Sequence, residues 1–297
     1  MNTQLPNLGL TGILGKGGTA TVYQGKQLST GRDVAVKVLE ADFVRSPEDV
    51  TRFINEAKAC ARFRHNNIVR VYDAGEEQGI YYFVMELVNG YTFATYLARK
   101  KQVAVEDVLI ILESVTEALK YAWQKFRVVH CDLKPDNIMV DSSGTIKLMD
   151  LGISKSLITA TRDAADGNEE IMGTPAYMSP DQIYDLSDID CRADIYSLGA
   201  TAYHLLTGTT LFPGKTDQQV IDSHVGASFA RDPRILAPTV PRALAQILNR
   251  MLAKDRNLRY PNWETLSADF QRLYAGETLL ATPLKPGESS VGFTLEW

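Results

Sequence analysis

Three polar side chains near the middle of the chain have the types that phosphoryl-transfer chemistry needs. Asp132, Lys134 and Asn137 lie within residues 129–140, between two apolar runs. A carboxylate can accept a proton from an attacking hydroxyl, an ammonium can hold a transferring phosphoryl group, and an amide oxygen can ligate a hard cation. The stretch therefore predicts a phosphoryl-transfer loop, and this hypothesis requires nucleotide-binding elements elsewhere in the chain.

A glycine-rich stretch near the N-terminus is the first such element. Residues 14–23 lie between apolar and β-branched runs and contain Gly15, Gly17 and Gly18. These glycines permit a tight turn whose backbone N–H groups approach phosphate oxygens. A hairpin turn without a ligand is the competing interpretation, because such loops are common.

A lysine and a glutamate follow on two further elements. Residues 33–39 predict a strand, whose apolar neighbours make an unpaired Lys37 ammonium costly. Ser46 and Pro47 predict the start of a helix that carries Glu56 beside its apolar stripe. Taken alone, Lys37 could extend its ammonium from a strand edge into solvent, and Glu56 could be a solvated residue of the helix flank.

The second half of the chain predicts mainly helices. Residues 106–125 have apolar side chains at helical spacing, and residues 194–206 are apolar nearly all round, which indicates a buried helix that begins with Asp194. A turn at 141–144 and a strand at 145–149 should return Asp150 to the side of Asn137. Two oxygen ligands so placed suit the octahedral demand of Mg²⁺.

These motifs, in this order over residues 8–274, resemble the catalytic domain of Hanks-type serine/threonine protein kinases of the bacterial kind. The resemblance implies an α+β, bilobal protein kinase fold with a small antiparallel β-sheet N-lobe that contains one key helix, and a larger, mainly helical C-lobe. It implies an N-lobe at residues 8–88 that ends in a hinge, a C-lobe at 89–274, and a C-terminal tail at 275–297. Lys134 and Thr174 favour serine/threonine over tyrosine specificity.

The resemblance also assigns roles to single residues. Asp132 would orient the substrate hydroxyl, Lys134 would offset charge on the moving group, and Lys37 would hold the triphosphate while paired with Glu56. Asn137 and Asp150 would bind Mg²⁺, with Mn²⁺ as an alternative ion. Asp194 would hold the catalytic-loop backbone, Asp181 would pair with Arg259, and Thr174 would have a structural role. The implied ATP-binding residues are Gly15, Gly17, Gly18, Val22, Ala35, Lys37, Met85, Glu86, Val88 and Met139.

One departure from the family pattern bears on regulation. Cys131 stands where the family usually has arginine before the catalytic aspartate, which makes this a non-RD variant. The positive charge of such an arginine is neutralised by a phosphate on the activation loop, here residues 153–172. A cysteine carries no positive charge and needs no such phosphate. We therefore expect activity without obligatory phosphorylation of that loop. Ala20 for the third glycine and Asp181 for glutamate are milder departures.

Composition limits the partners. The net charge of −5 and unclustered basic residues give no indication of nucleic-acid binding, and no apolar run is long enough for a membrane helix. The three cysteines lack metal-ligand spacing, which favours free thiols in a reducing, cytoplasmic compartment. Protein substrates are the expected partners.

The tail and the alternatives to catalysis complete the predictions. Alternating apolar residues from Val291 to Trp297 predict a strand that fills a groove or sheet edge, in its own molecule or by partner docking or self-association; a disordered terminus is the alternative.

A nucleotide-binding pseudokinase scaffold is the main alternative function, although Lys37, Asp132, Asn137 and Asp150 are all present. A small-molecule phosphotransferase would lack the 173–181 segment, and a pure interaction module would need no metal ligands.

Overall fold

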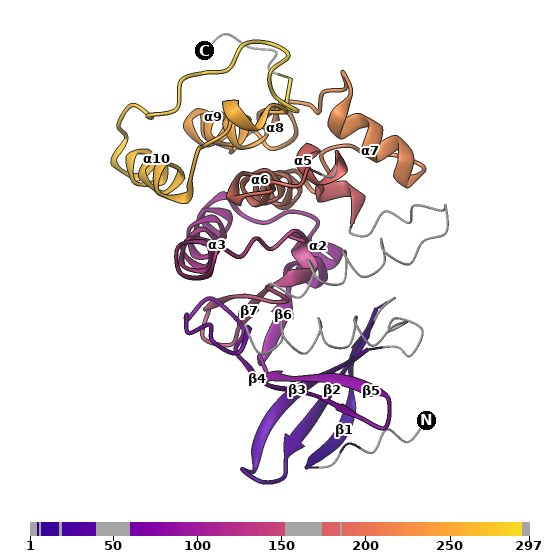
Figure 1. Ribbon diagram of the computed structural model, residues 1–297. Coiled ribbons are helices and arrows are strands. Elements are labelled where there is room, and N and C mark those ends of the chain that lie inside the picture. The colour runs from indigo at the N-terminus through magenta and orange to yellow at the C-terminus, as the bar shows by residue number, and fades with distance from the viewer. Residues whose placement is uncertain are drawn as a thin grey trace. The chain divides into compact units, whose positions relative to one another are not determined.

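The protein is described by a computed structural model that covers Leu5 and residues 7–17, 20–39, 60–151, 174–184 and 186–292. The chain divides into two compact units: unit 1 is Met1–Gly90 with Met149–Met172, and unit 2 is Tyr91–Leu148 with Gly173–Trp297. Unit 1 is built on an antiparallel sheet and unit 2 is mainly helical, as the fold class predicts (Figure 1). The predicted helix that carries Glu56 lies, up to residue 59, outside the described residues. Residues 149–172, which the predicted division assigns to the C-lobe, group with unit 1.

The sheet of unit 1 has the strand order β1-β2-β3-β5-β4, and its neighbouring strands are antiparallel. Its strands are β1 (Leu8–Lys16), β2 (Ala20–Gln27), β3 (Arg32–Leu39), β4 (Val71–Glu77) and β5 (Ile80–Glu86). Gln78 and Gly79, both with positive φ, form the two-residue turn between β4 and β5. Such a turn matches the twist of the strands that it joins. Short antiparallel connections therefore build most of this sheet.

Alternation along β3 separates the two faces of the sheet. Val34 and Val36 pack with Leu8 and Val84 on one face, whereas Ala35, which lies between them in sequence, belongs to a second apolar cluster. Successive strand residues point to opposite faces, so the register of β3 decides which side chains share a surface. The second cluster is the one that contains predicted nucleotide-binding residues.

Helices make up most of unit 2, and α6 is central among them. α6 contacts α3 on one side and α9 on the other, and most of its side chains are buried (Figure 1). The prediction of a buried helix there is confirmed. The helices are α2 (Phe93–Lys100), α3 (Val105–Phe126), α5 (Pro180–Ile183), α6 (Cys191–Thr207), α7 (Asp217–Val225), α8 (Pro233–Leu236), α9 (Arg242–Met251) and α10 (Trp263–Ala275).

A small three-stranded sheet, the last two of whose strands follow α3 in the chain, borders the loop of interest. Its strands are β6 (Gly90–Thr92), β7 (Ile138–Asp141) and β8 (Ile146–Leu148), in that order. β7 and β8 form the predicted hairpin, in which Ile138 pairs with Leu148. A 3₁₀ turn at Pro135–Asn137 leads directly into β7. The loop at residues 129–137 is thus bounded by regular structure.

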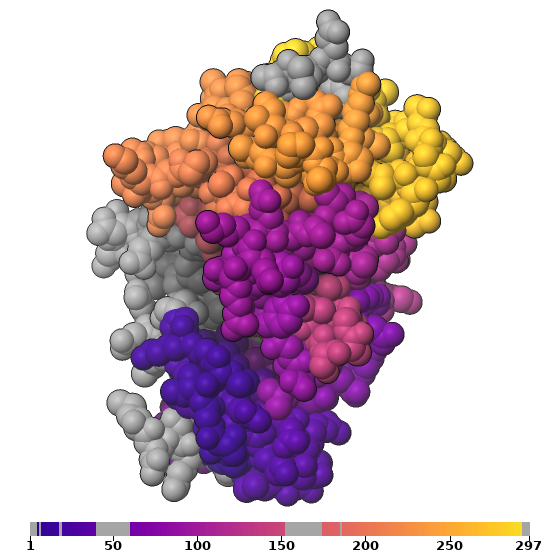
Figure 2. Space-filling view, turned by 180° about the vertical axis from the view of Figure 1, so that it is seen from behind, coloured from indigo at the N-terminus to yellow at the C-terminus, as the bar shows by residue number. Residues whose placement is uncertain are grey.

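The chain after α10 packs onto unit 2. Ala281, Ser289, Ser290 and Val291 are all at most 5% exposed, so the described part of the tail is not a disordered terminus. Figure 2 shows the yellow C-terminal residues beside the orange helices that precede them. Within the described range, Val291 belongs to an apolar cluster of the chain's own molecule, while residues 293–297, which carry most of the predicted strand, lie outside that range, so the strand stays a prediction. None of the helices in the described part of the chain is both long and apolar enough to span a membrane.

Candidate active site

Lys37 lies on β3 and forms an ion pair inside unit 1. Its neighbours across the sheet are Val22 on β2 and Phe83 on β5. Nζ of Lys37 is 2.7 Å from Oδ2 of Asp150, and the two side chains are 14% and 20% exposed. The anion that the structure places beside Lys37 is thus Asp150. Glu56, the partner expected from the sequence, lies outside the described residues.

Asp150 has an unusual backbone conformation. Its φ of 56° lies in the left-handed region, which is costly for residues other than glycine and occurs mostly where surroundings enforce it. The next residue, Leu151, is buried, and its carbonyl accepts a hydrogen bond of 3.0 Å from Sγ of buried Cys60. This contact holds the chain just after the aspartate.

The glycine-rich turn is described in part. Gly15 pairs with Val22 across β1 and β2, and the N–H of Gly17 donates to the carbonyl of Ala20 at 2.9 Å, whereas Gly18 lies outside the described residues. A Cβ on Gly15 would meet nothing within 4 Å, and one on Gly17 would meet only the Ala20 carbonyl oxygen, at 3.6 Å. Packing among the described residues therefore does not require glycine at either position.

The predicted adenine-contacting residues of unit 1 share one apolar cluster. Ala35 and Met85 are opposite each other on β3 and β5, and Val22 and Val88 pack against them. Glu86 ends β5, where its N–H donates to the carbonyl of Arg70 at 2.8 Å. Met139, the remaining member of the predicted set, lies on β7 in unit 2.

In unit 2, buried side chains hold the backbone of the predicted catalytic loop. The Asp194 carboxylate accepts hydrogen bonds from the N–H groups of His130 and Cys131 at 2.7 and 2.9 Å. Nε2 of Gln182 donates to the Cys131 carbonyl at 2.6 Å. Cys131 has a φ of 65°, so these bonds on both sides keep a non-glycine residue in the left-handed region. Burial raises the pKa of Asp194, while nearby His130 and the two N–H donors work in the opposite direction.

The functional side chains of the loop converge on Asp132. Nζ of Lys134 is 2.8 Å from Oδ2 of Asp132, and Nδ2 of Asn137 donates to Oδ2 at 3.1 Å and to the Asp132 backbone carbonyl at 2.8 Å. In both hydrogen bonds the donor is the side-chain nitrogen of Asn137, and the side-chain oxygen takes part in neither. Asp132 and Lys134 are each 20% exposed, so this acidic and basic pair remains open to solvent.

Lys134 also connects the loop to the segment predicted to hold a peptide substrate. Its Nζ donates to Oγ1 of Thr174 at 2.8 Å, just before the 3₁₀ turn Pro175–Tyr177. The segment then enters α5 through a capping box, in which the Ser179 hydroxyl accepts the N–H of Gln182 and the Gln182 side chain accepts the N–H of Ser179. One lysine therefore contacts both Asp132 and the substrate segment.

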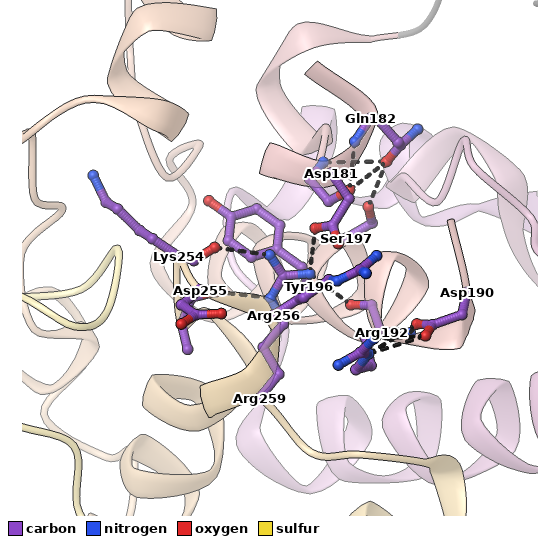
Figure 3. A network of polar contacts seen from close by, with 12 residues as sticks. Asp181, Gln182, Asp190, Arg192, Tyr196, Ser197, Lys254, Asp255, Arg256 and Arg259 are labelled. Atoms are coloured by element: carbon purple, nitrogen blue, oxygen red, sulfur yellow. Dashed lines mark hydrogen bonds and ion pairs between the residues drawn. The ribbon is translucent and has the colours of Figure 1, made fainter. Parts of the chain in front are cut away.

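A fully buried ion pair anchors α5. Nη1 of Arg259 is 2.6 Å from Oδ2 of Asp181, with side-chain exposures of 0% and 3%, which confirms the predicted contact (Figure 3). The guanidinium also donates to the carbonyls of Ala253, Arg192 and Lys254 at 2.7 to 3.1 Å. Aspartate, one methylene shorter than the usual glutamate, thus reaches the arginine. Burial lowers the pKa of Arg259, and the adjacent Asp181 carboxylate opposes that shift.

Two contacts of this site are not among those predicted from the sequence. Gln182, which holds the Cys131 carbonyl, follows Ser179 by three residues, and this spacing is a recognisable capping-box signal. Tyr177 makes a 2.7 Å hydrogen bond between its hydroxyl and Nδ1 of His204 on α6, and no local sequence pattern indicates that pairing. The metal site predicted from Asn137 and Asp150, which belong to different units, stays a prediction.

Comparisons with known proteins agree with this arrangement. A family model for the protein kinase domain matches residues 9–270. The serine/threonine-protein kinase PrkC of Bacillus subtilis is 34% identical over 267 residues, which are 90% of this chain and 40% of PrkC. PknB of Mycolicibacterium smegmatis is 35% identical over 269 residues, 89% of this chain and 42% of PknB. The chain therefore spans about two fifths of the length of these curated relatives.

A solved structure supports the fold. The crystal structure of the Mycobacterium tuberculosis PknI kinase domain is similar at a TM-score of 0.72 and 27% identity, and the match covers 91% of this chain and 96% of that one.

Proposed function

Because the chain belongs to the protein kinase domain family, we propose that it is an ATP-dependent protein serine/threonine kinase. It would transfer the γ-phosphoryl group of ATP to serine and threonine hydroxyls of protein substrates. The observation that carries the proposal is the convergence of Lys134 and Asn137 on the Asp132 carboxylate. The Lys134 contact to Thr174 supports serine/threonine specificity, because the same ammonium reaches the substrate segment.

The roles of the residues follow from their chemistry. Asp132, a carboxylate that is 20% exposed, would orient the substrate hydroxyl and accept its proton, and Lys134 beside it would offset charge on the moving phosphoryl group. Lys37 would hold phosphate oxygens, with Glu56 as its further partner. Packing among the described residues gives no reason for glycine at 15 and 17, and this supports the predicted approach of both, together with Gly18, to the triphosphate.

Nucleotide and metal would be held by groups of suitable type. The apolar cluster of Val22, Ala35, Met85 and Val88 fits the flat face of adenine, with Met139, the Glu86 carbonyl and the Val88 N–H as further contacts. Asp150 and Asn137 offer the hard oxygen donors that Mg²⁺ prefers, and Mn²⁺ accepts the same donors. A cation held by these residues would supply positive charge that offsets the charge on the phosphates. Catalysis by this chain's own residues would then be mainly positioning and electrostatic stabilisation.

The test is transfer of labelled phosphate from ATP to a generic basic protein. We expect transfer by the chain as given with Mg²⁺, and a loss of at least about a thousandfold, roughly 4 kcal/mol in the barrier, in Asp132→Asn and in Lys37→Met. The two variants remove different functions, proton acceptance and phosphate binding. No transfer by the unaltered chain with Mg²⁺ or Mn²⁺, while ATP still binds, would favour a pseudokinase scaffold instead.

We also propose that phosphorylation of the activation loop is not obligatory. Cys131 is 6% exposed, so its position buries a neutral thiol where an arginine would bury a cation. Residues 153–172 lie outside the described range, so the observation that supports the proposal is the burial of Cys131 alone. Combined alanine substitution of Ser154, Ser156, Thr159 and Thr161 should leave the transfer rate within about threefold, under about 1 kcal/mol. A hundredfold loss would show that another cation, such as Lys155, requires a phosphate.

The cytoplasm is the proposed compartment. It supplies ATP, and Cys60, Cys131 and Cys191 are buried thiols outside any disulfide, as suits a protein in a reducing environment.

A further inference from the structure

The segment after α10 is fixed along the surface of unit 2 by a series of hydrogen bonds. The buried Asp269 carboxylate accepts the N–H groups of Leu280 and Ala281 at 2.6 and 3.0 Å, and Gln246 donates to the Ala281 carbonyl at 2.6 Å. Further along, the N–H of Ser290 donates to the Leu252 carbonyl at 2.8 Å. The family match ends at residue 270, so these contacts come from a part of the chain beyond the matched domain.

The end of this segment is buried in the core. Ser290 is 0% exposed and Val291 is 3% exposed. Val291 lies in the same apolar cluster as Tyr177 and Tyr196, and Ala176 packs against that cluster. The main chain is held as well, because the Ala230 N–H donates to the Ser290 carbonyl and the Gly292 N–H to the Ala230 carbonyl, each at 2.8 Å. The tail therefore belongs to the same apolar cluster as two residues of the substrate segment.

A chain of polar contacts leads to the same segment. The Ser290 hydroxyl is 2.8 Å from the Tyr196 hydroxyl, which in turn is 2.8 Å from Nδ1 of His224 on α7. Nε2 of His224 is buried and makes no hydrogen bond of standard geometry within the described part of the chain. The backbone carbonyls of Pro175 and Ala176 nonetheless lie close enough to the ring to raise its pKa against the larger effect of burial.

Protonation states give the polar chain a direction. Burial lowers the pKa of His224 to about 4, so the imidazole is neutral near pH 7, and burial raises the pKa of Tyr196, so its hydroxyl keeps its proton. With the imidazole hydrogen on Nε2, toward the carbonyls of Pro175 and Ala176, Nδ1 accepts from the Tyr196 hydroxyl. The Tyr196 oxygen then accepts from Ser290. In this order the hydroxyls of Tyr196 and Ser290 each have an acceptor.

We infer that Ser290 and Val291 position the Pro175–Tyr177 segment for substrate binding, with Ser290 acting through Tyr196 and His224. The inference rests on the proposed function, because it takes Pro175–Tyr177 to be part of the surface that holds the protein substrate. Neither Ser290 nor Val291 is a catalytic residue in this account. Their removal should loosen the substrate segment and leave the ATP-binding residues of unit 1 unchanged.

Two adjacent serines offer a matched experiment. Ser289 and Ser290 are both at most 2% exposed, but the Ser289 hydroxyl bonds to backbone groups, donating to the Asn249 carbonyl on α9 and accepting the Val291 N–H, whereas the Ser290 hydroxyl contacts Tyr196. Ser289→Ala and Ser290→Ala should therefore lose similar amounts of thermal stability. Only Ser290→Ala should raise the KM for a peptide substrate, by about fivefold, which corresponds to one lost hydrogen bond of ordinary strength. The KM for ATP and the substrate-independent hydrolysis of ATP should not change.

Two further measurements test the route of the effect and separate it from the proposed function. In a Tyr196→Phe background, Ser290→Ala should have no additional effect on the peptide KM, because the contact through which it acts is already absent. Hydrogen exchange requires no catalysis: backbone amides of residues 174–184 should exchange several times faster in Ser290→Ala than in Ser289→Ala or the unaltered chain.

Equal changes in the two serine variants, in both KM and exchange, would overturn the inference and show that the tail only adds stability. Faster exchange in Ser290→Ala alone, in a chain without phosphate transfer, would support the positioning contact and reject the proposed function.

Discussion

Two ion pairs that involve predicted site residues, one in each compact unit, differ in their burial. In unit 1, Lys37 and Asp150 are 14% and 20% exposed, and in unit 2, Arg259 and Asp181 are 0% and 3% exposed. The distances are nearly equal, 2.7 and 2.6 Å. Access to water, not contact length, is therefore what distinguishes them.

The surroundings of the two cations explain what each pair can do. The Arg259 guanidinium donates to three backbone carbonyls besides its carboxylate and lies 5.0 Å from the centre of the Tyr196 ring, so it has no freedom to change partners. Lys37 has a compact ammonium on a flexible stem with some access to water. Such a group can exchange one anion for another, as binding of phosphate would require. We infer that the buried pair is structural and the accessible pair functional.

The largest effect should come from removal of Arg259. Arg259→Met would leave the buried Asp181 carboxylate without its cation, and loss of one partner from a buried pair costs about 3–5 kcal/mol. Urea denaturation measures this loss as a lower midpoint. The matched control is Arg256→Met, because Arg256 pairs with the 65% exposed Asp188 and should lose less than about 1 kcal/mol.

Equal losses in the Arg259 and Arg256 variants would contradict the structural role of the buried pair. If Arg259→Met fails to fold while Arg256→Met folds, the loss of stability in the Arg259 variant exceeds the stability of the protein, which also supports the structural role.

Much of this comparison could be predicted from local sequence. The loop at 129–137, the strand that carries Lys37 and the buried helix α6 all follow from residue types at short spacing, and the family pattern adds the contact between Asp181 and Arg259. Local periodicity determines which face of an element is apolar, so these elements were predictable within a few residues. The α3 helix is an example: expected at 106–125, it extends over Val105–Phe126.

Partners distant in sequence were not predictable in the same way. Ser290 contacts Tyr196, which lies 94 positions earlier in the chain. No local sequence pattern around Ser290 indicates which residue its hydroxyl will contact. His224 likewise looks like an ordinary polar residue of a surface helix, although it is fully buried. Alternation from Val291 to Trp297 predicts a strand; Val291 forms a bridge to Ala230, and residues 293–297 lie outside the described part of the chain. Such contacts depend on how whole helices pack, which short-range patterns do not specify.

Low pH should also destabilise the buried region around the Arg259–Asp181 pair, with a smaller effect than the Arg259→Met substitution. Tyr196 contacts both Arg259 and His224, and burial together with the charge of Lys254 lowers the pKa of His224 from 6.5 to about 4. Between these values the unfolded chain binds more protons than the folded chain, so stability falls as pH falls through this range. From pH 7 to pH 5 we expect His224 to account for a loss of about 2 kcal/mol.

The contribution of His224 is isolated by comparison with His224→Gln, which cannot titrate at that position. Urea midpoints at pH 5 and pH 7 should move further apart in the unaltered chain than in the variant. Parallel changes in both proteins would assign the acid sensitivity to other groups.

The smallest effect on stability should come from the accessible pair. Lys37→Met removes an ammonium whose partner, Asp150, keeps some contact with water, so the free energy of unfolding should fall by no more than about 1 kcal/mol. The same variant is expected to abolish phosphate transfer, and this contrast defines a functional residue. Urea denaturation and the transfer assay on one preparation make the measurement. A loss of stability comparable to that of Arg259→Met would show that Lys37 also holds unit 1 together, and the distinction between the two pairs would then fail.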